Sequence, residues 1–243
     1  METGSRSRYG DDADLWQLFR AIATGQTVDA FLLVKASPRL AVAASPTGAT
    51  RLLSQSYLLK EIGHYVYAGD TALHVAASAY QTHIARVLVD HGADVGARNR
   101  LGAQPIHYAA IGQPGSDKWD PRAQAATVTY LLRAGADPNA VDKSGVTALH
   151  RAVRTRCAAA VRVLLENGAD PRRRNGSGST PLHLAVRNTG RGGSATAAAR
   201  KQQREIIRLL MALGARMDDT DRRGQAFVDA VDPGRWKPPD TTI

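Results

Sequence analysis

The chain has 243 residues, 43% of them hydrophobic and only 5% aromatic, so leucine and small residues must supply most of its core. Its formal charge of +10 arises between Lys143 and Arg223, where 17 basic residues face 6 acidic ones, against 15 and 16 in the rest of the chain. No apolar run approaches the roughly 20 residues that a membrane-spanning helix needs. We therefore exclude an integral helical membrane protein.

The cysteine content and the N-terminus limit the cellular compartments in which we expect the protein. The single cysteine, Cys157, excludes an internal disulfide framework and a cysteine-based zinc site. The polar N-terminus contains no apolar signal core, so we do not expect secretion by a standard signal peptide. These features predict a soluble, cytoplasmic protein. We expect Cys157 to be a buried helix residue, and a reactive thiol is the alternative.

The first 40 residues predict a leader followed by two short helices. Residues 1–13 look like a disordered or tag-like leader. A helical face with apolar residues at i, i+3, i+4 and i+7 then begins, formed by Leu15, Leu18, Phe19 and Ile22. Gly25 interrupts this pattern and Val28 resumes it. Pro38 ends the second helix, because proline disfavours helical geometry in the residue before it.

Residues 41–66 fit no repeated pattern and form an insert before the regular part of the chain. The stretch 47–50 predicts a loop, and Arg51 to Glu61 could form a further helix. Tyr65 and Tyr67 lead into the regular part. We expect these two tyrosines to pack on it rather than to bind a ligand.

A four-residue phrase ending in histidine then occurs four times. The copies are Thr71-Ala72-Leu73-His74, Gln104-Pro105-Ile106-His107, Thr147-Ala148-Leu149-His150 and Thr180-Pro181-Leu182-His183. Each is followed by an apolar stretch, a leucine-rich helix and a Gly-Ala pair that begins at Gly92, Gly135, Gly168 or Gly214. Two histidine intervals are 33 residues and the middle one is 43. A period in this range is typical of a solenoid, in which each unit packs only on its neighbours.

The repeated phrase has a physical role at the start of a helix. The threonine hydroxyl can accept from an unsatisfied helical amide, and Pro105 and Pro181 stand where a missing N–H costs nothing. The glycines are expected to adopt the left-handed geometry that ends a helix. Stacked helices lie about 8–10 Å apart, whereas two imidazoles that share a zinc ion need bonds of about 2.0–2.1 Å. The histidines therefore predict no metal site, and the sequence predicts no cofactor.

Taken together, these motifs from about Tyr67 to Val231 resemble an ankyrin-repeat array. The resemblance implies an all-α, ankyrin-repeat solenoid of helix–turn–helix repeats with projecting hairpin-like loops. It also implies that each repeated histidine ties the loop of one repeat to the next by hydrogen bonds. Ankyrin arrays chiefly bind proteins, so we expect a non-catalytic interaction module that holds a protein partner in its concave groove.

The period and the resemblance together predict the domain order. It comprises a leader at 1–13, a degenerate N-terminal capping repeat with a more polar outer face at 14–40, the insert at 41–66, repeat 1 at 67–98, repeat 2 at 99–141 with an inserted loop at 111–121, repeat 3 at 142–174, repeat 4 at 175–220 with an inserted loop at 188–198, a truncated C-terminal cap at 221–232 and an irregular tail at 233–243.

The resemblance places the variable groove positions in the loops and after the paired alanines of each repeat. Carried over to this sequence, they are Arg100, Leu101, Ile111, Lys143, Ser144, Val146, Arg154, Ser177, Ser179 and Arg187. The inserted loop of repeat 2 adds Trp119, because tryptophan is enriched among the residues that dominate binding. Trp119 either packs on its own repeat or anchors an interface, and we favour packing.

An arginine stripe extends over repeats 3 and 4. Its members lie on or after the first helix of repeat 3, in the following loop and one repeat further on: Arg151, Arg154, Arg156, Arg172, Arg173, Arg174 and Arg187. Three interpretations stay open, namely an ordinary solvated surface, a site for an acidic protein partner, and a site for nucleic acid or an anionic membrane surface. The stripe lacks the interleaved aromatic residues on which unpaired bases stack.

A catalytic site has no support in the sequence, and we predict none. His64, His83 and His91 are the histidines outside the repeated phrase, and no nucleophile or acid stands at a recognisable spacing from them. The segment 190–194 is glycine-rich but lacks the Gly-Lys-Ser/Thr ending of a phosphate-binding loop. A repeat-borne enzyme would need a pocket that joins His64, Tyr65 and Tyr67 to the long loops.

Overall fold

The computed structural model describes residues 6–112, 119–186 and 197–216. The chain divides into two compact units, and each is described by itself. The first unit comprises Met1–Ala109 and Ala126–Asp137, and the second comprises Ala110–Ala125 and Pro138–Ile243. Within the described ranges, none of the helices has the length and apolar character that crossing a membrane requires.

The first unit begins with three helices: α1 (Arg6–Ala23), α2 (Thr27–Ala36) and the short α3 (Arg39–Val42). The turn between α1 and α2 contains Gly25 at φ +78°, and α2 stops just before Ser37-Pro38, as predicted. The prediction of an irregular leader at 1–13 is wrong from Arg6 onward, because the helical hydrogen-bond pattern of α1 already begins there.

The insert does not contain the predicted helix at 51–61. It contains a short 3₁₀ turn, η1 (Gln55–Tyr57), and a two-stranded hairpin of β1 (Leu58–Leu59) and β2 (His64–Tyr65). The Val66 N–H donates to the Tyr57 carbonyl at 2.8 Å, and the Ala49 N–H donates to the Val66 carbonyl at 2.7 Å. The pairing of Tyr57, Leu58 and Leu59 with residues 64–66, outside the segment, takes the place of the internal hydrogen bonds of a helix.

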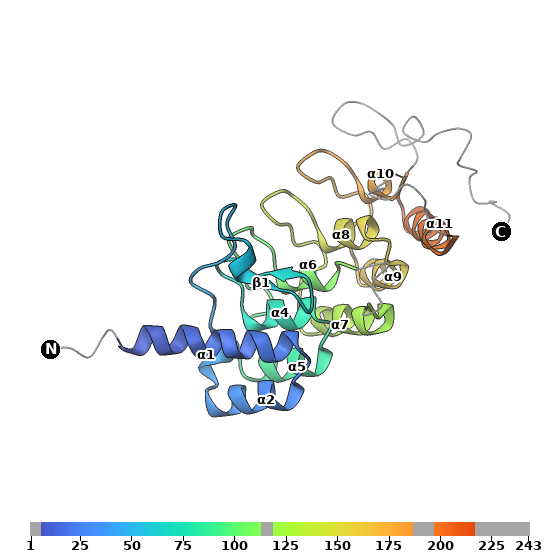
Figure 1. The fold of residues 1–243 in the computed structure, drawn as a ribbon. Coiled ribbons are helices and arrows are strands. Elements are labelled where there is room, and N and C mark those ends of the chain that lie inside the picture. The colour runs from blue at the N-terminus through green and yellow to red at the C-terminus, as the bar shows by residue number, and fades with distance from the viewer. Residues whose placement is uncertain (1–5, 113–118, 187–196, 217–243) are drawn as a thin grey trace. The chain divides into compact units, whose positions relative to one another are not determined.

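The regular helices of the first unit follow. They are α4 (Ala72–Ser78), α5 (Thr82–Asp90) and α6 (Pro105–Ala109), and α7 (Pro121–Arg133) contributes residues to both units. Helix α4 packs against α1, α5 and α6, and α5 also packs against α2. In this unit α1 lies beside α2 and α4 beside α5, as Figure 1 shows. The core is made of fully buried aliphatic and aromatic side chains such as Phe19, Ile22, Leu73 and Leu88.

The second unit repeats this arrangement with α8 (Ala148–Arg154), α9 (Ala158–Glu166), α10 (Pro181–Val186) and α11 (Ala197–Ala212). Helix α8 packs against α9 and α10, and α11 packs against α9 and α10. The chain between α9 and α10 extends away from these helices as a long loop (Figure 1). Leu149, Leu164 and Leu210 are fully buried between them, and Cys157 is buried as predicted.

The helix termini confirm the local predictions. Thr71 and Thr147 are the N-cap residues of α4 and α8, and Pro105 and Pro181 are the first residues of α6 and α10. The glycines that follow the second helices all have positive φ, namely Gly92 (+89°), Gly135 (+99°), Gly168 (+87°) and Gly214 (+105°). Helices thus dominate the described residues, which confirms the all-α prediction.

Several predicted segments fall wholly or partly outside the described residues. Most of the inserted loop at 188–198 does so, and its last two residues belong to α11. The truncated cap at 221–232 and the tail at 233–243 lie entirely outside.

Candidate partner-binding surface

The projecting loops, called fingers here, are residues 93–103, 136–146 and 169–179, and each is braced by one side chain. The braces are Asn99, Asp142 and Asn175. In each case Oδ1 accepts hydrogen bonds from the backbone N–H groups two and four residues later, at 2.8–3.1 Å. The repeated motifs in the sequence do not by themselves identify these braces. Their signal is an Asp or Asn three residues before a positive-φ glycine, at Gly102, Gly145 and Gly178.

The repeated histidines connect the fingers to the helices. Nε2 of His74 lies 3.1 Å from the Ala103 carbonyl, and Nε2 of His150 lies 3.2 Å from the Ser179 carbonyl. Nδ1 of each ring accepts from the N–H of its own N-cap threonine. Nε2 therefore carries the proton and donates to the finger. Burial lowers the pKa of both His74 and His150, which favours this neutral form. The predicted tie between one repeat and the next is confirmed at these two positions.

The second unit exposes basic side chains on two successive fingers. Lys143, Arg172, Arg173 and Arg174 are exposed, and we call them the finger patch. The Gly176 N–H donates to the Ser144 carbonyl at 2.7 Å, so the two finger tips touch through their backbones. On α8, Arg154 is exposed as well. The finger patch is therefore presented on a braced backbone rather than on loose chain.

Three residues that the sequence analysis assigned to partner binding are used inside the chain. Ser179 is only 1% exposed, so its side chain is not available to a partner. Arg151 forms an ion pair with Asp142 at 2.8 Å. Arg100 donates to the Ala49 carbonyl and lies over the ring of Tyr67, 5.2 Å from its centroid. These two arginines brace a finger and the insert respectively.

The ion pair with Arg151 also holds the Asp142 carboxylate in its charged form. Burial alone would raise the pKa of Asp142, but the hydrogen bond from Arg151 and those from the Val146 and Ser144 N–H groups lower it overall. The charge of Arg151 is therefore balanced locally.

The remaining predicted positions are exposed at Leu101, Ser144 and Ser177 and half-buried at Ile111 and Val146. Arg187 lies outside the described residues.

Trp119 is half-buried, and its ring is held in place. Its indole Nε1–H donates to Oε1 of the buried Gln124 at 2.8 Å. A Cβ built on Gly112 would lie 3.1 Å from Cζ2 of the indole, so the ring packs directly on that glycine. The Gly112 N–H in turn donates to the Thr155 hydroxyl at 2.9 Å. The structure thus shows the predicted packing of Trp119 on its own surroundings, with part of the ring still exposed.

The first unit contains a buried polar cluster that the sequence did not reveal. The carboxylate of Asp70 accepts from His64 Nε2 at 3.2 Å, the Tyr67 N–H at 2.8 Å and Asn99 Nδ2 at 2.8 Å. Asn99 also donates to the Tyr108 hydroxyl at 2.8 Å. Burial alone would raise the pKa of Asp70, but the hydrogen bond from His64 and that from the Tyr67 N–H help to lower it.

His64 was one of the side chains that a repeat-borne active site would need. It is buried, and its ring contacts that of Tyr108 edge-on with the centroids 4.7 Å apart. The hydrogen bond to Asp70 joins the hairpin insert to repeat 1, and the ring contact joins it to α6 of repeat 2. This arrangement favours a structural role for His64.

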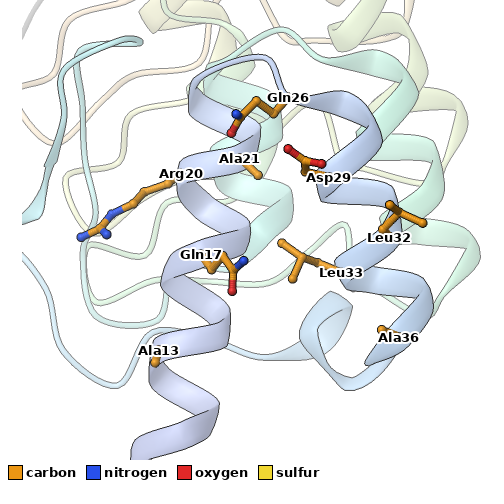
Figure 2. Close-up of a pocket in the computed structure, with 9 residues that line it drawn as sticks. All are labelled: Ala13, Gln17, Arg20, Ala21, Gln26, Asp29, Leu32, Leu33 and Ala36. Carbon is orange, nitrogen blue, oxygen red and sulfur yellow. The ribbon is translucent and has the colours of Figure 1, made fainter.

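A groove of about 510 Å³ lies between α1 and α2. Its lining, shown in Figure 2, is Ala13, Gln17, Arg20, Ala21, Gln26, Asp29, Leu32, Leu33 and Ala36. The prediction that this terminal unit has a more polar outer face is wrong for α2. Val28 is 70% exposed and Leu32 is 53% exposed, because Ala30 and Val34 are the residues of α2 that face the core.

The sequence relationships agree with this geometry. A family model described as ankyrin repeats (three copies) matches residues 40–117 and 122–221, which is more than two thirds of the chain. The chain therefore belongs to the ankyrin-repeat family. Arrays of this family generally mediate interactions between proteins.

The individual relatives each match less than two fifths of this chain. The chain is 34% identical over 93 residues to BCL-6 corepressor-like protein 1 of Homo sapiens, a match that covers 38% of this chain and 5% of that protein. It is 41% identical over 96 residues to E3 ubiquitin-protein ligase KEG of Arabidopsis thaliana, covering 37% and 5%. It is 39% identical over 90 residues to ankyrin repeat and SOCS box protein 16 of Mus musculus, covering 36% and 19%. The chain thus spans less than a fifth of the length of each of these relatives.

Proposed function

We propose that the protein is a non-catalytic binding module whose repeats 3 and 4 hold an acidic segment of a protein partner. The finger patch, together with Arg154 on α8, forms the contact surface. The observation that carries this proposal is a concentration of exposed basic side chains on two fingers whose tips are joined by the hydrogen bond between Gly176 and Ser144. The single cysteine agrees with a cytoplasmic location.

Charge complementarity favours an acidic partner. Between Lys143 and Arg223 the sequence has 17 basic and 6 acidic residues. One of these acids, Glu205, is paired with Arg162 and Arg208 away from the fingers. Another, Asp170, uses Oδ1 to accept from the Arg172 N–H. Clustered basic side chains on a rigid backbone attract carboxylates over a distance and fix them by charge-assisted hydrogen bonds.

A charge-reversal experiment tests the proposal. Affinity capture from cell lysate with the wild-type chain supplies a partner, which is then purified and titrated against the variants by calorimetry. The Arg154→Glu/Arg173→Glu variant should lose about tenfold or more in affinity, because it places carboxylates opposite carboxylates. The matched control is Arg200→Glu/Arg204→Glu, which makes the same charge change at exposed positions of α11. Equal affinities of the two variants would refute the finger assignment.

The nucleic-acid alternative is a second outcome of the same experiment. A basic surface that binds DNA or RNA loses affinity steeply with salt, since counterions are released from the phosphates. Retention of a DNA duplex at about 50 mM salt that disappears at about 300 mM salt would favour this alternative. Binding of the purified protein partner in the absence of nucleic acid would instead support the proposal.

A further inference from the structure

The turn between α8 and α9 places an arginine where the backbone favours glycine. Arg156 has φ +57°, and the equivalent residue of repeat 1, Tyr80, has φ +54°. Both stand six residues after the repeated histidine. This left-handed conformation is unfavourable for residues with a side chain. Residues kept in such conformations are concentrated at functional sites.

The same turn is attached to the Trp119 loop. Thr155, between Arg154 and Arg156, accepts from the Gly112 N–H at 2.9 Å and donates to the Arg151 carbonyl at 3.0 Å. The indole of Trp119 packs on Gly112 and is fixed by its hydrogen bond to Gln124. One half-exposed aromatic ring is therefore held next to a turn whose flanking residues are both arginines. We call Trp119, Arg154 and Arg156 the Trp119 corner.

The acidic residue next to Trp119 in the sequence is Asp120, and one carboxylate offsets only one of the two arginine charges of the corner. Asp120 follows Trp119 directly, and its Oδ1 accepts from the N–H groups of Arg122 and Ala123 at 2.7 and 3.2 Å. This carboxylate thus caps the start of α7. The Cys157 thiol lies on the other side of Arg156, and burial raises its pKa, so it contributes no negative charge. The corner combines positive charge with a fixed apolar ring.

We infer that the Trp119 corner binds an acidic segment that carries an aromatic or aliphatic side chain next to its carboxylates. The inference rests on the proposed function and specifies the partner further. The indole face takes the apolar side chain at little entropic cost because the ring is already fixed. Arg154 and Arg156 take the neighbouring carboxylates, and arginine can do so through two parallel hydrogen bonds. Tryptophan and arginine are also the residues most enriched among binding hot spots.

Two synthetic peptides of equal length and charge test the inference. Both alternate Glu and Gly, both carry fluorescein, and one has a central Gly replaced by Phe. Binding is followed by fluorescence anisotropy at low salt. The wild-type chain should bind the Phe peptide about fivefold more tightly or better, since a well-placed aromatic anchor is worth at least this much. Trp119→Ala should remove the preference, and Trp119→Phe should restore part of it.

Arg156→Gly and Tyr80→Gly form the matched pair. Both relieve the same backbone strain, so both should keep or raise the temperature of thermal unfolding. Only Arg156→Gly should weaken binding of both peptides, by about threefold or more, because it alone removes a carboxylate contact. A loss of binding without a loss of stability cannot be attributed to misfolding.

The outcomes separate the two hypotheses. If Trp119→Ala keeps the preference for the Phe peptide, or if Arg156→Gly binds as the wild type does, the corner inference is wrong and the proposed function stands. If neither peptide binds the wild-type chain, both fail. A second readout uses the Trp16→Phe/Trp236→Phe variant, in which Trp119 is the sole tryptophan. Its emission should shift when the Phe peptide binds and remain unchanged with the Glu-Gly peptide.

Discussion

Repeats 1 and 3 have the same scaffold but differ in where their charged residues lie. Repeat 1 buries a charged residue inside the unit, whereas charged residues of repeat 3 are exposed on the fingers. Each has an N-cap threonine and a histidine that donates to a finger carbonyl, at 3.1 Å in repeat 1 and 3.2 Å in repeat 3. The residue before the threonine differs. It is Asp70 in repeat 1, fully buried and bound by three donors, and Val146 in repeat 3, half-buried and apolar. The first unit uses a buried charge to hold its insert in place, whereas the described part of the second unit exposes four basic side chains on its fingers.

The removal of Asp70 is the strongest test of this difference between repeats 1 and 3. We expect Asp70→Ala to lower the free energy of unfolding of the first unit by about 3 kcal/mol, since it leaves buried donors of His64 and Asn99 without an acceptor. Val146→Ala, the matched change in repeat 3, should cost about 1 kcal/mol or less, because it removes only part of a half-buried apolar side chain. Urea unfolding followed by tryptophan fluorescence measures both. Equal losses would contradict the asymmetry between the repeats.

The second prediction concerns the buried histidine that repeats 1 and 3 have in common. His74 and His150 have a lowered pKa in the folded chain and an ordinary pKa of 6.5 when unfolded. The unfolded chain therefore binds more protons once the pH falls below about 6.5, and the folded state loses up to about 1.4 kcal/mol per pH unit for each histidine. The lowered pKa of Asp70 adds no loss in this window, because its carboxyl stays ionised in both states well above its ordinary value of 3.8.

Urea midpoints measured from about pH 7 to about pH 5 check this expectation. His150→Gln should reduce the slope in the second unit and leave that of the first unit unchanged. A midpoint that does not move with pH in the wild-type chain would show that the buried rings take up a proton without penalty.

The smallest expected effect lies in repeat 2, the one copy of the phrase without threonine. Gln104 is buried, and its Oε1 accepts no hydrogen bond within the described residues. Its backbone N–H still donates to His107 Nδ1 at 3.1 Å, as in the other repeats. We expect Gln104→Thr to raise the free energy of unfolding by about 1 kcal/mol, because it restores a small N-cap hydroxyl. Thr147→Gln should lower it by a similar amount, and a Gln104→Thr chain of lower stability would contradict the explanation.

The parts of the fold that depend on local spacing could be predicted from the sequence. The caps at Thr71 and Thr147 and the helix ends at Gly92 and Gly168 recur with the period, and each depends on residues within one turn of a helix. The segment 51–61 could not be predicted in the same way. The backbone partners of Tyr57, Leu58 and Leu59 are residues 64–66, which lie outside the segment, and these pairings replace the hydrogen bonds of a helix.

The candidate surface also has features that the sequence predicts and features that depend on contacts between distant residues. The basic character of repeats 3 and 4 follows from composition, so Arg154 and the finger arginines could be named in advance. The ion pair that makes Arg151 unavailable to a partner depends on Asp142, and the signal for this residue is the Asp/Asn-x-x-Gly spacing of the finger brace. The Asp70 cluster was inaccessible to sequence reasoning, since its partners lie as far as 29 residues away along the chain.

The contact between the two finger tips has a consequence for how this surface can change. A Cβ built on Gly176 would lie 2.6 Å from the Ser144 carbonyl oxygen, so this glycine cannot be replaced without moving the neighbouring tip. The side chains of Lys143 and Ser177, next to this contact, are exposed and free of that restriction. A library that randomises these flanking positions while keeping Gly145 and Gly176 should yield new specificities on an unchanged backbone. We therefore expect the side chains at the finger tips to be exchangeable without a change in the backbone that carries them.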